Sequence, residues 1–293
     1  MRPNLHYADR DSAFWAYAKL LSEQLGYSKG DAVLHHSEAA ARAKLRELGI
    51  RINEALLGEA LSYLSFRAEV LNEFVRKRLM TMKQARAGFR EAREYYTENG
   101  FTSDLPLNKQ KHEKKDYAYF TGIINILTEK ALREYAKSQG LVYGEEVVCD
   151  FNPTSLSYIL SPTNELEGIM SRRFDGAFPS TVNPKLIWEI KEYYYTTTFG
   201  SRIADGVYET QLDGHEIKAI REETSRNVYH IYFIDDYNTW WNMGKSYLCR
   251  IIDMLHMGLV DEVIFGREVF KRWPKVLQGV LDAQRESRVK EAR

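Results

Sequence analysis

Two short stretches of this sequence contain residues that could act together chemically. Residues 186–191 read Leu-Ile-Trp-Glu-Ile-Lys and have the apolar content of a buried strand. Side chains alternate between the two faces of a strand, so Glu189 and Lys191 share one face and the apolar side chains share the other. Burying an acid and an amine costs free energy unless the two are paired or bind a metal. This conflict predicts a functional site rather than core packing.

Asp175 is the third candidate group. It is followed by Gly176, and four turn-forming residues separate it from the Glu189 strand, namely Pro179, Ser180, Asn183 and Pro184. The spacing predicts a β-hairpin with Asp175 on the first strand and Glu189 on the second. Neighbouring strands lie about 5 Å apart, so the two carboxylates would repel each other unless a cation lies between them. Oxygen ligands with open positions suit Mg²⁺.

These residues resemble a known catalytic motif. Asp175-Gly176, the hairpin-length spacer and Glu189-Ile-Lys191 are similar to the core of the PD-(D/E)XK nucleases, found in many type II restriction endonucleases. The resemblance covers roughly residues 120–270. It implies that Asp175, Glu189 and the Ile190 carbonyl bind Mg²⁺ or Mn²⁺, and that Lys191 positions or activates the attacking water. The motif's nominal proline is replaced here by Phe174.

The Glu-x-Lys pattern alone is weak, because it also occurs at residues 113–115 and 216–218. The first of these lies in a polar run without a strand pattern. The second lies in a segment with helical character, where residues two apart do not share a face. A surface salt bridge on an edge strand remains an alternative explanation for Glu189 and Lys191.

The surrounding sequence predicts an α/β fold with a restriction-endonuclease-like mixed central sheet flanked by helices. Apolar periodicity predicts helices and strands in alternation. The expected helices are 119–137, 207–221 and 246–259, and the expected strands are 141–143 with 146–151, 186–191, 228–234 and 261–266. This order is also that of the nuclease core.

Two further residues are candidates for a catalytic role through the resemblance. Some nucleases of this superfamily use a glutamine on the helix after the Glu-x-Lys strand, and Gln211 lies on the corresponding predicted helix. Others use an acid on the helix before the first strand, where Glu129 is the preferred candidate.

The first 115 residues have a different pattern from the rest. Apolar periodicity predicts helices over residues 11–25, 37–48, 53–80 and 81–96, with no strand pattern. Residues 102–116 have the composition of a linker. We therefore expect an all-helical region at 1–115, for DNA contact, dimerisation or bracing, and a nuclease core at 116–293.

Composition is consistent with a soluble enzyme and excludes several classes. No apolar run approaches the roughly 20 residues that span a bilayer, and the N-terminal residues lack the apolar segment of a signal peptide, so we expect a cytoplasmic protein without membrane contact. Two cysteines cannot form a four-cysteine metal or iron–sulfur site. The formal net charge is zero, but basic residues gather at 67–93, 109–115 and 271–293, which suits phosphate contacts.

Together these features predict a Mg²⁺-dependent DNA endonuclease. The resemblance implies a type II restriction endonuclease that cuts a specific site in double-stranded DNA and leaves a 5′-phosphate, with a cognate DNA methyltransferase in the same system. Two-fold symmetry predicts a homodimer for cutting both strands of a palindrome. Two alternatives stay open. One is a nuclease of repair, recombination or phage defence without strict sequence specificity, and the other is a non-catalytic DNA-binding protein.

Overall fold

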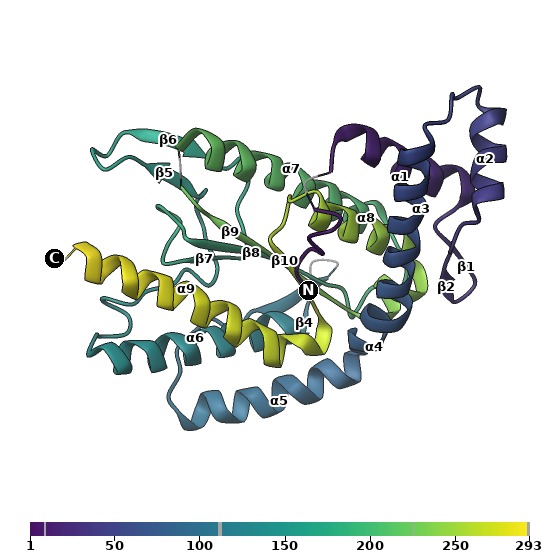
Figure 1. Cartoon of the computed structure of the whole chain (residues 1–293). Helices are drawn as coiled ribbons and strands as arrows, with labels where there is room; N and C mark the ends of the chain where they lie inside the picture. The colour runs from purple at the N-terminus through teal and green to yellow at the C-terminus, as the bar shows by residue number, and fades with distance from the viewer. Residues whose placement is uncertain (9, 111–112, 225, 292–293) are drawn as a thin grey trace.

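The chain forms a mixed α/β structure around a small central sheet (Figure 1). The computed structural model describes residues 1–8, 10–110, 113–224 and 226–291. The strands of the sheet lie in the order β10–β9–β8–β7. Strands β10, β9 and β8 are mutually parallel, and β7 is antiparallel to β8. Their bounds are Gly176–Phe178 for β7, Leu186–Glu192 for β8, Tyr229–Asp235 for β9 and Glu262–Phe265 for β10.

Helices cover both faces of this sheet, as Figure 1 shows. The face of β8 that carries Trp188 packs with α6 and α9 in one apolar core. The opposite face of the sheet packs against α7 and α8. A strand that is buried on both faces is expected to be nearly all apolar. Strand β8 departs from this expectation at Glu189, Lys191 and Glu192. The helix bounds are Tyr119–Gln139 for α6, Ser201–Thr224 for α7, Lys245–His256 for α8 and Val269–Glu291 for α9.

Most of the predicted core elements are confirmed. The predicted helix at 119–137 is α6, the one at 207–221 lies within α7, and the one at 246–259 is largely α8. The predicted strands at 228–234 and 261–266 are β9 and β10. These segments have long or strongly apolar patterns, which is the strongest signal available in a single sequence.

The predicted first strand at 141–143 and 146–151 is wrong. The chain instead turns at Gly144, whose φ of 91° suits glycine. The Val147 N–H donates a hydrogen bond to the Val142 carbonyl. These local bonds take backbone groups that a strand ladder would need. Asp150 alone pairs with Ala177 of β7, in an isolated antiparallel bridge. The predicted strand is therefore reduced to a single bridge at this edge of the sheet.

The N-terminal part is mainly helical, and the predicted helix starts are confirmed by capping side chains. Asp11, Ser37, Asn53 and Thr81 each accept a hydrogen bond from a backbone N–H in the first turn. The elements are α1 Ser12–Leu25, α2 Glu38–Glu47, α3 Glu54–Glu69, the π-helical η1 Val70–Val75, α4 Arg76–Arg78 and α5 Met82–Glu98. The expectation of a strand-free region at 1–115 is wrong at two places, and the first is the pairing of β1 Ser28–Lys29 with β2 Ala32–Val33.

The segment predicted as a linker contains a second hairpin. Strand β3, Leu107–Gln110, pairs antiparallel with β4, Glu113–Tyr117, and residues 111–112 lie outside the described part. The run at 113–115 therefore lies in a strand, contrary to the sequence prediction. A polar hairpin is held by backbone hydrogen bonds and has no apolar alternation by which to recognise it.

Four further short elements complete the described chain. A hairpin of β5 and β6 lies beside the second half of α7, and η2 and η3 precede α8 and α9. Their bounds are Tyr158–Leu160 for β5, Leu166–Ile169 for β6, Asn238–Met243 for η2 and Gly266–Glu268 for η3. Among the described helices, none has the length and apolar character needed to cross a membrane.

The N-terminal helices are joined to the core by a buried ion pair. Arg67 of α3 donates to both carboxylate oxygens of Asp253 on α8, at 2.9 Å each, and Tyr63 donates to the same carboxylate. Arg67 is 1% exposed, so it does not belong to the basic surface strip that the sequence suggested. Helix α5 packs against α6, with the Phe89 ring over Gly122. A domain boundary at residue 115 stays a prediction.

Candidate active site

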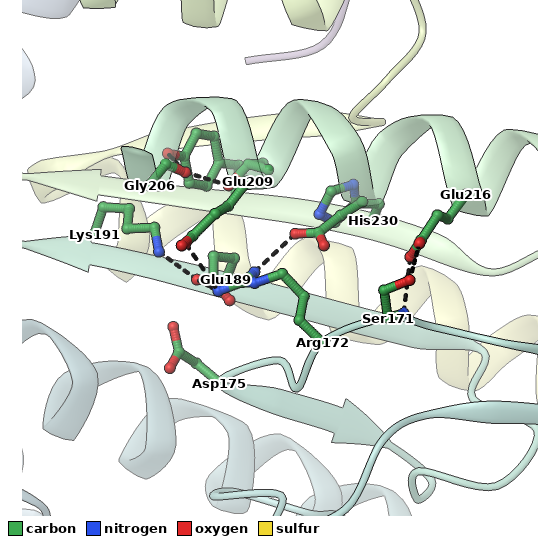
Figure 2. Close-up of polar contacts among 12 residues, drawn as sticks. Ser171, Arg172, Asp175, Glu189, Lys191, Gly206, Glu209, Glu216 and His230 are labelled. Atoms are coloured by element: carbon green, nitrogen blue, oxygen red, sulfur yellow. Dashed lines mark hydrogen bonds and ion pairs between the residues drawn. The ribbon is translucent and has the colours of Figure 1, made fainter. Parts of the chain in front are cut away.

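Strand β8 places Glu189 and Lys191 on the sheet face that α7 covers (Figure 2). Both side chains are buried, with 2% and 9% of the residue surface exposed. The Lys191 ammonium donates to Oε1 of Glu189. Gly206 allows α7 to pass close by, since a Cβ added there would lie 3.0 Å from Cε of Lys191. The predicted sharing of one face is confirmed, and this face is interior rather than a solvent edge.

Asp175 lies one residue before β7 and reaches the same site from the neighbouring strand. Its N–H donates to the Trp188 carbonyl at 3.0 Å, and its Oδ2 accepts from the Ile190 N–H at 2.7 Å. The Asp175 carboxylate thus accepts the hydrogen bond that a backbone carbonyl of β7 would accept if the strand extended this far. In an antiparallel pair, the N–H and C=O of one residue point to the same neighbour. The Ile190 carbonyl is therefore directed toward the Asp175 side of β8.

These groups line one cavity of about 500 Å³. Asp175, Glu189 and Lys191 contribute to its wall, together with Ile190. Two adjoining cavities also include Asp175 in their walls, one beside the loop at 171–174 and one of about 640 Å³ at the base of the β3–β4 hairpin. Asp175 therefore lies where three hollows of the surface meet. The cavity is completed by Arg172, Glu192, Tyr193, Ser201, Arg202, Asp205 and Glu209.

Arg172 is a further residue of the candidate site, and the sequence motif did not identify it. Its Nη2 donates to Oε1 of Glu189 at 2.9 Å, and its Nη1 donates to Oδ2 of Asp213 at 2.8 Å. Figure 2 shows this guanidinium between β8 and α7. In the sequence, Arg172 lies three residues before Asp175, and Asp213 lies in the segment predicted as the helix 207–221. Neither observation indicated that the two residues meet, because 41 residues separate them.

The charges of the site shift its pKa values in opposite directions. Burial alone would raise the pKa of Glu189, but the Lys191 and Arg172 cations outweigh it and lower the pKa. Burial opposes the charge of Lys191, yet the Glu189 carboxylate raises the pKa of this amine above its ordinary value. Glu189 is therefore an anion and Lys191 a cation at neutral pH.

The pKa of Asp175 is raised, in contrast to the lowered pKa of Glu189. Loss of hydration among the surrounding protein atoms is the largest effect and raises the pKa of Asp175, and the negative charge of Glu189 raises this pKa further. Its side chain is nevertheless open to solvent in the cavity, which limits this effect. Two acids of opposite tendency around one cavity are typical of functional sites. A bound cation would favour the charged form of both.

The donor set fits a hard divalent cation. Glu189 Oε1 receives both neighbouring cations, while Oε2 is buried and has no hydrogen-bond partner among the described residues. A buried carboxylate oxygen without a partner is costly and calls for a ligand. In the described parts of the chain, no three His, Cys, Asp or Glu side chains are arranged to hold a metal. The candidate set is thus two carboxylates and a main-chain carbonyl, and Mg²⁺ commonly binds through one or two carboxylates with waters.

The structure does not bring the other two candidates, Glu129 and Gln211, to this site. Glu129 accepts from the N–H groups of Thr102 and Ser103 and pairs with Arg133, so it holds the loop before β3. Gln211 is on α7 two residues from Asp213 and has no hydrogen bond to the site within the described residues. A different acid, Glu192, lies next to the cavity and accepts from the first turn of α6.

The geometry defines a mixed α/β protein with a buried acid–lysine pair and a second acid on the adjoining strand. Residues 80–280 match the family described as Domain of unknown function (DUF7687), and the chain belongs to this family. Residues 1–74 match a second family, described as Domain of unknown function (DUF7690). No curated protein and no solved structure matches the chain.

Proposed function

We propose that this protein is a Mg²⁺-dependent nuclease that hydrolyses phosphodiester bonds in double-stranded DNA. The observation that supports it most is the meeting of Asp175, Glu189 and Lys191 at one cavity, where Oε2 of Glu189 has no hydrogen-bond partner among the described residues. This is the set of residues that the PD-(D/E)XK resemblance requires. The mixed sheet with parallel β8 and β9 and antiparallel β7 is consistent with a restriction-endonuclease-like core.

The residues of the chain divide the work between them. Asp175, Glu189 and the Ile190 carbonyl would hold the metal ion. Bound Mg²⁺, which Mn²⁺ can replace, supplies Lewis-acid chemistry that makes a water molecule more acidic and offsets charge on the phosphate oxygens. Lys191 remains protonated because its pKa is raised, so it acts as a hydrogen-bond donor to the attacking water or the scissile phosphate.

A basic stripe on α5 offers a path for the DNA backbone. The positions of Lys83, Arg86, Arg90 and Arg93 follow each other at helical spacing of three or four residues, and all four are exposed. Arg86 pairs with Asp116 and Arg93 lies over the Tyr117 ring, so the stripe borders the β4 strand. The β3–β4 hairpin starts at the cavity that Asp175 shares. Cations along such a path favour phosphate binding.

The finer proposal is a type II restriction endonuclease that acts as a homodimer on a specific site, with a cognate DNA methyltransferase. It rests on the resemblance and on the presence of N-terminal helices, beyond the core, that could read DNA. A nuclease of relaxed specificity would use the same site. Discrete fragments from genomic DNA would indicate the restriction enzyme, and a smear would indicate the relaxed nuclease.

The test is cleavage of plasmid DNA by purified protein with Mg²⁺. We expect Asp175→Asn and Lys191→Gln each to reduce the rate by at least about 10²-fold, as for the loss of one transition-state contact. Lys218→Ala, an exposed change on α7, serves as the control and should cleave at the wild-type rate. Cleavage at equal rates by all three variants would remove the assignment. DNA binding without cleavage by the wild type would favour the non-catalytic alternative.

A further inference from the structure

Arg172 is held by a row of acids along one face of α7. Glu209, Asp213 and Glu216 are spaced by four and three residues, which places them on the same side of the helix. Arg172 contacts the first two, at 3.4 Å from Glu209 and 2.8 Å from Asp213. The preceding residue, Ser171, donates its N–H to Glu216 at 2.9 Å. The loop before Asp175 is therefore fastened mainly to α7.

Among the described residues, Arg172 makes one bond to the sheet, and this bond ends on the proposed metal ligand. That bond, from Nη2 to Oε1 of Glu189, uses the same oxygen that Lys191 already holds. A divalent cation beside Glu189 would be repelled by a guanidinium in contact with this carboxylate. The bond to Asp213 has no such conflict, because Asp213 lies on α7 and does not line the metal cavity.

From this asymmetry we propose that Arg172 is a resident partner of Glu189 that releases this carboxylate to a divalent metal ion and then donates to a phosphate oxygen of the DNA. The inference rests on the proposed function. Asp213 and Glu209 keep the guanidinium at the wall of the cavity during the exchange. Arginine is suited to the second role because its planar fork binds phosphate through two parallel hydrogen bonds.

Metal binding without DNA tests the first half of this inference. Titration calorimetry with Mn²⁺ should show Arg172→Gln binding about 10-fold more tightly than wild type or better, because a charged hydrogen bond that competes for Glu189 is gone. The control is Arg173→Gln, the same charge change at the adjacent exposed residue, which should bind Mn²⁺ like wild type. Asp175→Asn should abolish binding in each background.

A double variant separates release of Glu189 from a new ligand. Removal of Arg172 leaves Asp213 buried without its cation, and this acid could bind Mn²⁺ itself. Arg172→Gln combined with Asp213→Asn should keep the gain in affinity if the gain comes from Glu189. Loss of the gain in the double variant would overturn the inference.

DNA affinity tests the second half. With Ca²⁺ in place of Mg²⁺ to prevent cleavage, Arg172→Gln should bind a short linear duplex about 10-fold more weakly than wild type, although it binds metal more tightly. A residue with a merely structural role would not shift the two affinities in opposite directions. Unchanged Mn²⁺ affinity in Arg172→Gln, with normal metal binding by wild type, would overturn this inference alone. Absence of Mn²⁺ binding by all proteins would overturn the proposed function as well.

Discussion

At the scale of single residues, the site combines charges that would be unfavourable apart. Glu189 is almost fully buried and remains an anion because Lys191 and Arg172 both bind it. Truncating one partner of such a group leaves an uncompensated buried charge, which is strongly destabilising. Conservative variants are therefore better probes of this site than alanine at Glu189. Its unpartnered oxygen distinguishes the cluster from a completed structural salt bridge.

A second buried acid, away from the metal cavity, predicts a dependence of stability on pH. Asp235 ends β9 and accepts from the Met80 N–H at 2.7 Å and from the Tyr194 hydroxyl. Burial raises the pKa of Asp235 to about 8. In the folded protein this group keeps its proton up to about pH 8, whereas in the unfolded chain it loses the proton near its ordinary value. Its contribution to stability is therefore full at low pH and is lost as pH rises from about 4 through about 8.

The variant Asp235→Asn resembles the protonated acid and should remove this dependence. We expect urea unfolding of wild type to show a loss of a few kcal/mol between about pH 5 and about pH 9 that the variant does not share. The comparison is between the slopes of unfolding free energy against pH for the two proteins, so the contributions of other titrating groups cancel. Parallel pH curves for the two proteins would show that Asp235 titrates normally.

At the scale of elements, the sequence predicts what local patterns determine and misses what tertiary contacts determine. The helix starts at residues 37 and 53 and the apolar run of β8 depend on local patterns, and the structure has them where they were expected. The strand expected at 146–151 failed because the turn at Gly144 takes its hydrogen bonds. Arg172 was missed as a site residue because its partners lie on α7, and neither spacing nor periodicity indicates a contact between a loop and a distant helix.

The basic stripe on α5 makes a prediction at this scale. Lys83 and Arg90 have no ion-pair partner among the described residues, so their charges are available to phosphate. The variant Lys83→Ala/Arg90→Ala should weaken duplex binding in Ca²⁺ and reduce the slope of log affinity against log salt by about 2, close to one for each phosphate contact. The matched control is Arg46→Ala/Lys19→Ala, at two exposed residues on α2 and α1.

Binding that falls equally in both double variants would indicate a general charge effect. An unchanged salt slope in the α5 variant would place the DNA elsewhere. Cleavage by the α5 variant should recover at low salt, because its metal site is intact.

At the scale of the whole molecule, two matched families meet in one folded unit. The DUF7690 match ends at residue 74, and the DUF7687 match begins at residue 80. The junction between the two matches therefore falls where η1 leads through α4 to α5. The Arg67–Asp253 pair crosses between the two parts, and Ser22 of α1 accepts from the same guanidinium at 2.8 Å. The two parts therefore share a buried polar network and are expected to unfold together.

Breaking that network should destabilise the whole protein. Asp253→Asn removes the charge that compensates the buried Arg67, and we expect a loss of about 3–5 kcal/mol in the free energy of unfolding. Glu54→Gln, which breaks the exposed pair with Arg42, is the control and should leave stability within error. A single transition by both circular dichroism and fluorescence should be kept. Two separate transitions in wild type would show that the parts fold independently.

The central claim is that a divalent ion binds between Asp175 and Glu189, and anomalous diffraction tests it most directly. Crystals of the protein grown with Mn²⁺ should give an anomalous peak within bonding distance of both carboxylates, about 2.0–2.2 Å as for small hard cations, with the Ile190 carbonyl as a further ligand. Arg172 should then no longer contact Glu189. Saturating Mn²⁺ with no peak at this cavity, and with the Arg172–Glu189 bond intact, would contradict the account.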